Sequence, residues 1–371
     1  MPSKIPQLAG SSLVQRLFAQ LRRLSRRNRL IVLAGFVVLL GVIADYLMVI
    51  HSPMLKQGES VKIEVGSGSN LTRIVYDLKR LGYIAKPRYL LLYAKLSGPA
   101  NKISTGEYLI KPGMSAADFM DQVLSGKVIQ YSITIVEGWN IYQLLDVLNA
   151  DPNIVHTLQG LSHTQIMQQI GYPDVHPEGR FYPDTYHFPK GLTDVQFLKR
   201  AYVAMQAKLA REWEMRATGL PYKTPAEALT MASIVEKETG RPSERQAIAG
   251  VFVRRLEKRM RLQTDPTVIY GLLPTFDGNI RRRDLKRDTP YNTYRRYGLP
   301  PTPIAMPGGE ALHAAMHPAE GDALYFVSRG DGSHYFSASL EEHNKAVIQY
   351  QLKGRKRSFS SFDAKTGKTK K

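Results

Sequence analysis

The longest apolar stretch of the chain runs from Leu30 to Ile50, and Asp45 is its only charged residue. At ~1.5 Å of rise per residue, a helix of this length spans about 30 Å, the thickness of the hydrocarbon core of a bilayer. Basic residues at 22–29 precede it, and the positive-inside rule places them in the cytoplasm. We therefore expect a single-pass transmembrane helix over residues 30–50, with Asp45 near the outer headgroups.

A cleaved signal peptide is the competing interpretation of this stretch. A signal peptide also combines basic residues with an apolar run, but the apolar run of a signal peptide is usually shorter than Leu30–Ile50. We favour an uncleaved anchor. Residues 1–29 then form a cytoplasmic basic tail, and the chain after residue 51 lies outside the cytoplasm.

Between residues 61 and 150 the pattern changes three times from strand-like alternation to helical spacing. A turn with glycine separates the two patterns each time, and Ser115 and Asn140 stand where N-caps are expected. The pattern predicts three short strand–helix units in a domain over residues 51–150. Such βα units are similar to LysM-like modules, which bind cell-wall glycan; a small packing unit without a ligand is the alternative.

Residues 151–352 alternate helical patterns with loops and are predicted to form a second, mixed α/β domain. Helical spacing predicts helices over residues 194–218 and 225–239. Near the C-terminus, alternating runs on both sides of a turn at 330–332 predict a hairpin, followed by a helix. The fold class is therefore α+β, with a transmembrane helix, a LysM-like module and a mixed α/β domain.

The helix over residues 225–239 has clear start and stop signals. Thr224 is a suitable N-cap, Pro225 fits the first helical position, and Glu227 completes a capping box. Gly240 is a typical residue for ending a helix. The helix therefore carries the sequence TMASIVEKETG at its C-terminal end, with two glutamates two positions apart.

The helical phase separates these two glutamates. At about 100° per residue, Glu238 lies on the apolar face with Ile234 and Val235, whereas Glu236 lies at the margin of that face. Burial and the negative helix terminus both raise the pKa of a carboxyl group in this place, as a general acid near neutral pH requires. The alternative is an exposed helix end whose Glu238 pairs with an arginine.

Two later segments contain candidate binding residues. In QTDP, Asp265 precedes a proline, which predicts an N-cap role for Asp265. The loop over residues 289–308 is rich in proline and contains Tyr291 and Asn292. Aromatic rings and amides on a rigid loop suit sugar binding, because sugars stack on rings and hydrogen-bond through hydroxyls.

Composition and charge exclude several function classes. The formal net charge is +19, but residues 1–29 and the tail at 353–371 carry 14 of these charges, so nucleic-acid binding by the folded part is not expected. The chain has no cysteine, which excludes thiolate chemistry. A P-loop, a G-x-S-x-G elbow and an H-E-x-x-H motif are absent. The nine histidines are scattered, and we predict no metal site.

The motifs ASIVEKET, RLQTDPTVIYG, YNTY and GLPPTPIAMPG, in this order, resemble the YceG-like family of endolytic murein transglycosylases. The resemblance extends from the apolar stretch to the region of residue 350. It implies a lyase that cleaves nascent peptidoglycan strands after N-acetylmuramic acid without water, leaves 1,6-anhydro-muramyl ends and limits strand length. No cofactor is implied.

The resemblance also implies roles for particular residues. The family's catalytic glutamate falls on the second Glu of EKET, Glu238, and Glu236 is the reserve candidate. One carboxyl group suffices in such a reaction, unlike the pair used by ordinary glycosidases. The predicted substrate-binding residues match family motif positions, although each could be purely structural: Glu236, Gln263, Asp265, Tyr291 and Asn292.

The implied partners are peptidoglycan strands, the membrane and, as candidate neighbours, peptidoglycan synthases. A non-catalytic, membrane-tethered peptidoglycan-binding protein is the alternative function. A tethered nucleic-acid binder, suggested by net charge alone, is a second alternative.

Overall fold

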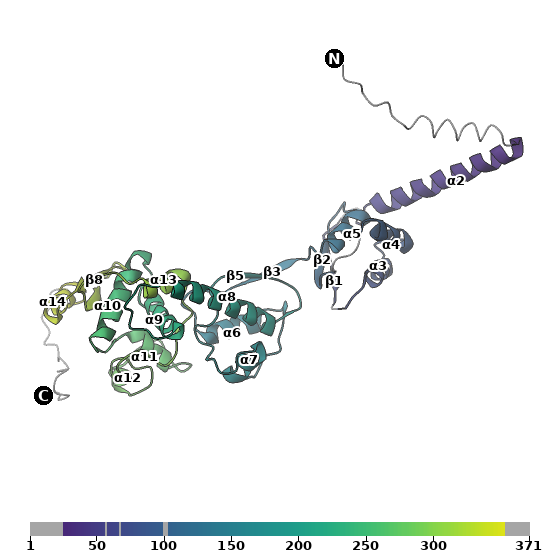
Figure 1. Cartoon of the computed structure of the whole chain (residues 1–371). Coiled ribbons are helices and arrows are strands. Elements are labelled where there is room, and N and C mark those ends of the chain that lie inside the picture. The colour runs from purple at the N-terminus through teal and green to yellow at the C-terminus, as the bar shows by residue number, and fades with distance from the viewer. Residues whose placement is uncertain (1–24, 56–57, 67, 99–102, 353–371) are drawn as a thin grey trace, which may run out of the picture. The chain divides into compact units, whose positions relative to one another are not determined.

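The computed structural model describes residues 25–55, 58–66, 68–98 and 103–352. The chain divides into two compact units, Met1–Gln130 and Tyr131–Lys371 (Figure 1). Most of the predicted N-terminal tail and all of the tail at 353–371 lie outside the described residues. The two units are therefore presented separately.

The described residues of the first unit form one long helix, two paired strands and three shorter helices. In chain order its described elements are α2 (Arg26–His51), β1 (Val61–Val65), α3 (Leu71–Arg80), α4 (Pro87–Leu96), β2 (Gly106–Ile110) and α5 (Ala116–Leu124). Strands β1 and β2 are antiparallel, with Ile63 opposite Tyr108. The helices cover this pair and bury a core that includes Val75, Leu78 and Phe119.

Helix α2 is long and apolar enough to cross a bilayer. Its most apolar window has a mean hydropathy of 2.5, and none of that window is buried within the protein. These properties fit an anchor and a signal sequence equally. The C-terminal end of α2 packs on α4 and α5, and Ile50 is buried there.

Asp45 has partners in the first unit. Its carboxylate accepts hydrogen bonds from the Lys86 ammonium at 2.6 Å and from the Tyr89 hydroxyl at 2.7 Å. The expectation that Asp45 lies among headgroups overlooked these residues, which are more than 40 positions away along the chain. The contact fixes the end of α2 to the N-terminal end of α4.

The three predicted strand–helix units are present, as β1–α3, β2–α5 and β3–α6. Ser115 and Asn140 are the N-caps of α5 and α6, and both form complete capping boxes. The third unit, however, belongs to the second compact part of the chain, which begins at Tyr131 rather than after residue 150. The LysM-like character of the first unit stays a prediction.

The second unit is mainly helical. Its strands form two-stranded sheets that pair β3 with β5, β4 with β6 and β7 with β8. In chain order its described elements are β3 (Gln130–Thr134), α6 (Ile141–Ala150), β4 (Ile154–Val155), α7 (His163–Ile170), β5 (Thr185–Pro189), β6 (Leu192–Thr193), α8 (Asp194–Glu214), α9 (Pro225–Glu238), η1 (Pro242–Glu244), α10 (Arg245–Glu257), α11 (Asp265–Gly271), α12 (Arg282–Lys286), α13 (Gly309–Met316), β7 (Tyr325–Ser328), β8 (His334–Ser337) and α14 (Leu340–Tyr350).

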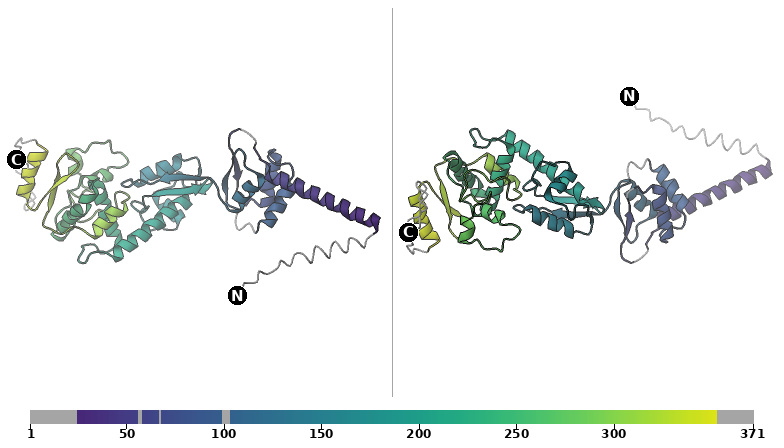
Figure 2. Two further views of the ribbon diagram at one scale, coloured as in Figure 1. Left: turned by 90° about the horizontal axis from the view of Figure 1, so that it is seen from above. Right: turned by 90° about the horizontal axis from the view of Figure 1, so that it is seen from below.

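Helix α9 lies at the centre of this unit. It packs against α8, α10, α11 and α13, and every residue from Ala228 to Val235 is buried (Figure 1). The β7–β8 hairpin and α14, both predicted from the sequence, lie together at the C-terminal end of the unit (Figure 2). The end of α9 is therefore held by a rigid surrounding core.

The predicted boundaries of α9 agree with the structure, whereas its terminal contacts differ in part. The Thr224 hydroxyl accepts the Glu227 N–H, as predicted, but the Glu227 carboxylate accepts the N–H of Lys223 instead of completing a capping box. The helix ends at Glu238, Thr239 after it is extended, and Gly240 does not adopt the left-handed conformation. Helix α8 ends at Glu214, four residues earlier than predicted.

One glycine permits a close helix–loop contact. A Cβ atom at Gly250 in α10 would collide with the carbonyl oxygen of Ala319. Because that oxygen belongs to the backbone, relief would require the two segments to separate. Arg254 donates to the same carbonyl at 3.0 Å and so fixes the contact.

Candidate active site

Glu238 is the last residue of α9 and is only partly buried. Its carboxylate accepts a hydrogen bond from the hydroxyl of Thr264, which lies just before α11. Burial raises the pKa of Glu238, and nearby Asp265 raises it further, while Thr264, His334 and Arg255 act in the opposite direction. Among the described residues, Glu238 forms no ion pair, so its environment favours the protonated acid.

Hydrogen bonds join the two predicted binding segments, but through residues that the sequence analysis did not select. Thr264 donates its N–H to the Thr293 hydroxyl at 3.1 Å, and Gln263 donates its N–H to the Thr293 carbonyl at 3.2 Å. The hydroxyl of Thr267 lies 2.9 Å from that of Thr293. Thr264 and Thr293 are both 2% exposed, so these bonds form a buried connection beside Glu238.

Asp265 directly follows Thr264, which is bonded to Thr293, and Asp265 does not cap α11. Thr264 is the N-cap residue, and Asp265 occupies the first turn of the helix. The Asp265 carboxylate accepts a hydrogen bond from the hydroxyl of Tyr294 at 2.6 Å. Asp265 therefore lies close to Glu238, and Tyr294 holds its carboxylate in place.

Gln263 is positioned by Arg255 of α10. The buried Arg255 guanidinium donates to the carbonyl of Leu262 at 2.8 Å and to the side-chain oxygen of Gln263 at 3.3 Å. Gln263 has a φ of 55°, a conformation that residues with a Cβ atom rarely adopt. The strained turn at Gln263 directs Thr264 towards the carboxylate of Glu238.

Asn292 has a structural role. Its side-chain NH₂ group donates to the carbonyls of Asp284, Leu285 and Arg287, and its side-chain oxygen accepts the Tyr294 N–H at 3.0 Å. It is 1% exposed. Because its hydrogen-bonding groups are used internally, the prediction that Asn292 binds substrate is not supported by this geometry.

Tyr291 belongs to a separate cluster. Its hydroxyl lies 2.8 Å from that of Thr302, and its ring packs edge-on against Tyr270 with centroids 4.9 Å apart. Tyr270 hydrogen-bonds to Glu178, a fully buried carboxyl group that also accepts the N–H of Ile141 at 3.1 Å. Burial raises the pKa of Glu178 to about 7. Through Tyr270 and Tyr291, Glu178 thus connects the loop over residues 289–308 to the start of α6.

Glu236 points to a different set of partners from Glu238. Its carboxylate accepts the N–H of Gly308 at 2.9 Å and lies 3.6 Å from the guanidinium of Arg245. Burial raises the pKa of Glu236, and Glu137 adds to this rise, while Gly308 and Arg245 oppose it. Arg245 also pairs with Glu310, so several carboxylates share one arginine.

A cavity of about 980 Å³ lies beside Arg245, the arginine that faces Glu236. It is lined in part by Glu137, Arg245, Glu310 and His313. Its size is in the range of ligand sites. Glu236 is thus a fixed, paired carboxylate near a cavity. Within the part of the chain that the structure describes, Glu238 forms no ion pair and accepts a hydrogen bond from the Thr264 hydroxyl.

The sequence analysis missed four neighbours of the predicted site: Thr264, Thr293, Tyr294 and His334. Thr264 lies between two selected residues, and Tyr294 is the last residue of YNTY, so both stood within recognised motifs. His334 is placed on β8, where Glu244 binds its ring at 2.7 Å. No local pattern indicates that His334 approaches α9.

Comparisons with known proteins agree on one family. A model described as the YceG-like family matches residues 63–349. The endolytic murein transglycosylase of Bacillus subtilis (strain 168) is 31% identical over 310 residues, covering 78% of this chain and 85% of that protein. The endolytic murein transglycosylase of Streptococcus pneumoniae serotype 2 (strain D39) is 26% identical over 324 residues, covering 78% of this chain and 58% of that protein.

A solved structure gives the same result. The crystal structure of a YceG-like protein from Listeria monocytogenes has 30% sequence identity and a TM-score of 0.50, and it covers 77% of this chain and 98% of that chain. The family model matches residues in both compact units described here. The chain therefore belongs to the YceG-like family.

Proposed function

We propose that the chain is an endolytic peptidoglycan lytic transglycosylase in which Glu238 is the acid and base. The observation that carries this proposal is the state of Glu238: a partly buried carboxyl group with a raised pKa and, among the described residues, no ion pair. The names of its relatives supply the substrate class, murein.

In the proposed reaction a single carboxyl group performs two proton transfers. Protonated Glu238 donates its proton to the glycosidic oxygen as the bond from the muramyl C1 to that oxygen breaks. The resulting carboxylate then takes the proton of the muramyl C6 hydroxyl, whose oxygen forms a bond to C1. The product end is a 1,6-anhydro-muramyl residue, water is not consumed, and Glu238 regains its proton.

The neighbours of Glu238 support this cycle. Burial keeps the acid protonated before the first step, and the Thr264 hydroxyl stabilises the carboxylate formed in between. The Thr264–Thr293 bond holds Thr264 in place. Tyr294 and Asp265 stand beside the carboxyl group and are the best-placed polar groups for contact with a sugar.

We further infer that α2 anchors the protein in the inner membrane, with the N-terminus in the cytoplasm and the chain after residue 51 in the periplasm. Its length and hydropathy support this, and the basic residues before it support the orientation. Such a protein would act on glycan strands near the membrane, where peptidoglycan synthases work. Cleavage there would limit strand length.

The test compares Glu238→Gln with Glu236→Gln, using full-length protein purified in detergent and peptidoglycan strands as substrate. Mass spectrometry of the products counts anhydro-muramyl and reducing ends. We expect Glu238→Gln to lose at least about 100-fold in rate, because the amide has no proton to cycle. Glu236→Gln should retain anhydro-forming activity.

Three outcomes would contradict the proposal. Full activity of Glu238→Gln together with loss in Glu236→Gln would transfer the catalytic role to Glu236. Reducing ends in place of anhydro ends would indicate hydrolysis. Binding of strands without cleavage by the wild-type protein would support the non-catalytic, peptidoglycan-binding alternative.

A further inference from the structure

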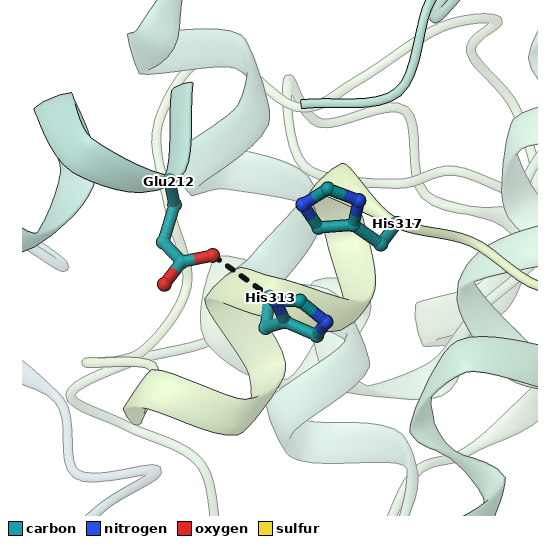
Figure 3. A group of neighbouring side chains, drawn as sticks. All are labelled: Glu212, His313 and His317. Atoms are coloured by element: carbon teal, nitrogen blue, oxygen red, sulfur yellow. Dashed lines mark hydrogen bonds and ion pairs between the residues drawn. The ribbon is translucent and has the colours of Figure 1, made fainter. Parts of the chain in front are cut away.

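Two histidines and a glutamate lie close together, and two of these three residues, Glu212 and His313, line the cavity of about 980 Å³. Glu212 lies near the end of α8, and His313 and His317 lie one turn apart at the end of α13 (Figure 3). One possible ligand atom from each residue lies within 4.8 Å of those of the other two. The sequence analysis overlooked this pair, although a separation of four positions places two side chains on the same face of a helix.

The three side chains are already oriented towards one another. The ring of His313 lies 3.1 Å from the Glu212 carboxylate through Nδ1, and the two imidazole rings stack with centroids 4.4 Å apart. A carboxylate can only accept, so Nδ1 of His313 carries the proton of that bond. Figure 3 shows both rings on the side of α13 that faces Glu212.

The backbone around this cluster is fixed. The carbonyl of His317 accepts a hydrogen bond from the side chain of Gln246 at 3.0 Å, and the carbonyl of Met316 accepts one from the N–H of Ala217 at 2.9 Å. The Glu212 side chain is only 6% exposed. The positions of the ligands therefore depend little on loop movement, and the half-exposed ring of His313 can adjust.

The carboxylate of Glu212 has one oxygen for each of two partners. Oε1 lies 3.2 Å from the ammonium of Lys208, and Oε2 faces His313. A metal ion that replaced the proton at His313 would bind Oε2 and leave the Lys208 contact intact. Lys208 would then orient the ligating carboxylate, as outer partners commonly do in metal sites.

The geometry points to a zinc site formed by Glu212, His313 and His317 that cross-links α8 and α13. Two imidazole nitrogens and one carboxylate oxygen suit Zn²⁺, with water as a fourth ligand. Atoms that share a tetrahedral zinc ion lie about 3.4 Å apart, so the three ligand atoms must close by up to about 1.4 Å. Rotation of the His313 ring supplies movement of this size.

Zinc at this site would affect how the helices of the second unit are held together. Helix α13 packs against α9, and Gly308, directly before α13, donates its N–H to Glu236. A cross-link between α8 and α13 would thus hold two of the four helices that pack against the glutamate-bearing helix. The expected consequence is stabilisation of this unit by zinc.

The experiment uses untagged, full-length protein in detergent, treated with a chelator and then dialysed. Titration with ZnCl₂ by calorimetry should give one equivalent bound per chain, and the melting temperature should rise with zinc. Glu212→Gln, His313→Gln and His317→Gln should each weaken zinc affinity by at least about tenfold. The control is His187→Gln, since His187 is exposed on β5, and it should bind zinc like the wild type.

His313→Gln is the decisive variant, because this half-exposed residue tolerates substitution without loss of the fold. The proposal is overturned if the wild-type protein takes up no zinc, or if folded His313→Gln binds zinc with unchanged affinity. Mg²⁺ binding of equal affinity would also overturn it, because imidazole ligands favour zinc over magnesium. These readouts do not depend on transglycosylase activity.

Discussion

The hydroxyl of Thr264 donates a hydrogen bond to the carboxylate of Glu238, across 26 positions of the chain. This bond joins the end of α9 to the residue that precedes α11. It favours the ionised form of Glu238, whereas burial favours the protonated form. The two effects together set the pH range in which the carboxyl group can donate a proton.

Thr264→Val should therefore change the pH profile of the proposed reaction. Loss of the donor destabilises the Glu238 carboxylate and raises its pKa further. The acid then stays protonated to higher pH, so the alkaline limb of kcat/KM should shift upward by about one pH unit. Thr264→Ser keeps the hydroxyl and should retain the wild-type profile. A downward shift in Thr264→Val would contradict the assignment of Glu238 as the acid.

Thr293→Val should destabilise the second unit. The change removes the oxygen that accepts the N–H of Thr264, and this buried donor then has no partner at that place. We expect a loss of about 1–3 kcal/mol in the free energy of unfolding, measured by urea denaturation. Thr293→Ser keeps the oxygen and loses only a methyl group, so it should cost less. Equal costs would show that methyl packing, not the hydrogen bond, is important.

Asn292→Ala distinguishes a structural from a substrate-binding role. The side chain satisfies three carbonyls and the N–H of Tyr294, so its removal should cost about 2 kcal/mol or more in stability. Thermal unfolding measures this loss, and the KM of the folded fraction should change little. An unchanged melting temperature with a raised KM would instead support the sequence-based prediction that Asn292 binds substrate.

Glu178 should make the stability of the protein depend on pH. Burial raises the pKa of Glu178 from its ordinary 4.5 to about 7, so the folded state binds this proton more tightly than the unfolded state. Its stabilising contribution is complete below pH 4.5 and is lost as the pH rises to about 7. The total loss is on the order of 3 kcal/mol.

Glu178→Gln removes this titration. The difference in unfolding free energy between the wild-type protein and Glu178→Gln should therefore fall between pH 4.5 and about 7 and be constant above that range. Denaturation at a series of pH values measures it. The same substitution at the exposed Glu320 is the matched control for the chemistry of the change. A difference that does not vary with pH would show that folding leaves the pKa of Glu178 unchanged.

Local sequence patterns predicted the elements of this protein well. The helix Pro225–Glu238, the caps at Ser115 and Asn140 and the C-terminal hairpin all depend on residues within a few positions of one another. Helical phase also separated Glu236 from Glu238, and the structure gives these two carboxylates entirely different partners.

Side-chain roles were harder to predict from the same motifs. Asn292 and Tyr294 stand in one short motif, yet Asn292 turns inward to backbone carbonyls and Tyr294 reaches Asp265. Asp265 has a typical N-cap context, but Thr264 occupies that position. The choice between such roles depends on which distant segment packs nearby, and the local sequence does not contain that information.

The sequence by itself determined the family motifs, the apolar helix and the glutamate-bearing helix, because these follow from residue type and short-range periodicity. Only the tertiary structure decided the partners of each carboxyl group: Thr264 for Glu238, Arg245 for Glu236, and the two histidines for Glu212. Proton affinity and metal affinity depend on burial and on the groups within a few ångströms. Those groups come together only when α8, α9 and α13 pack into one core.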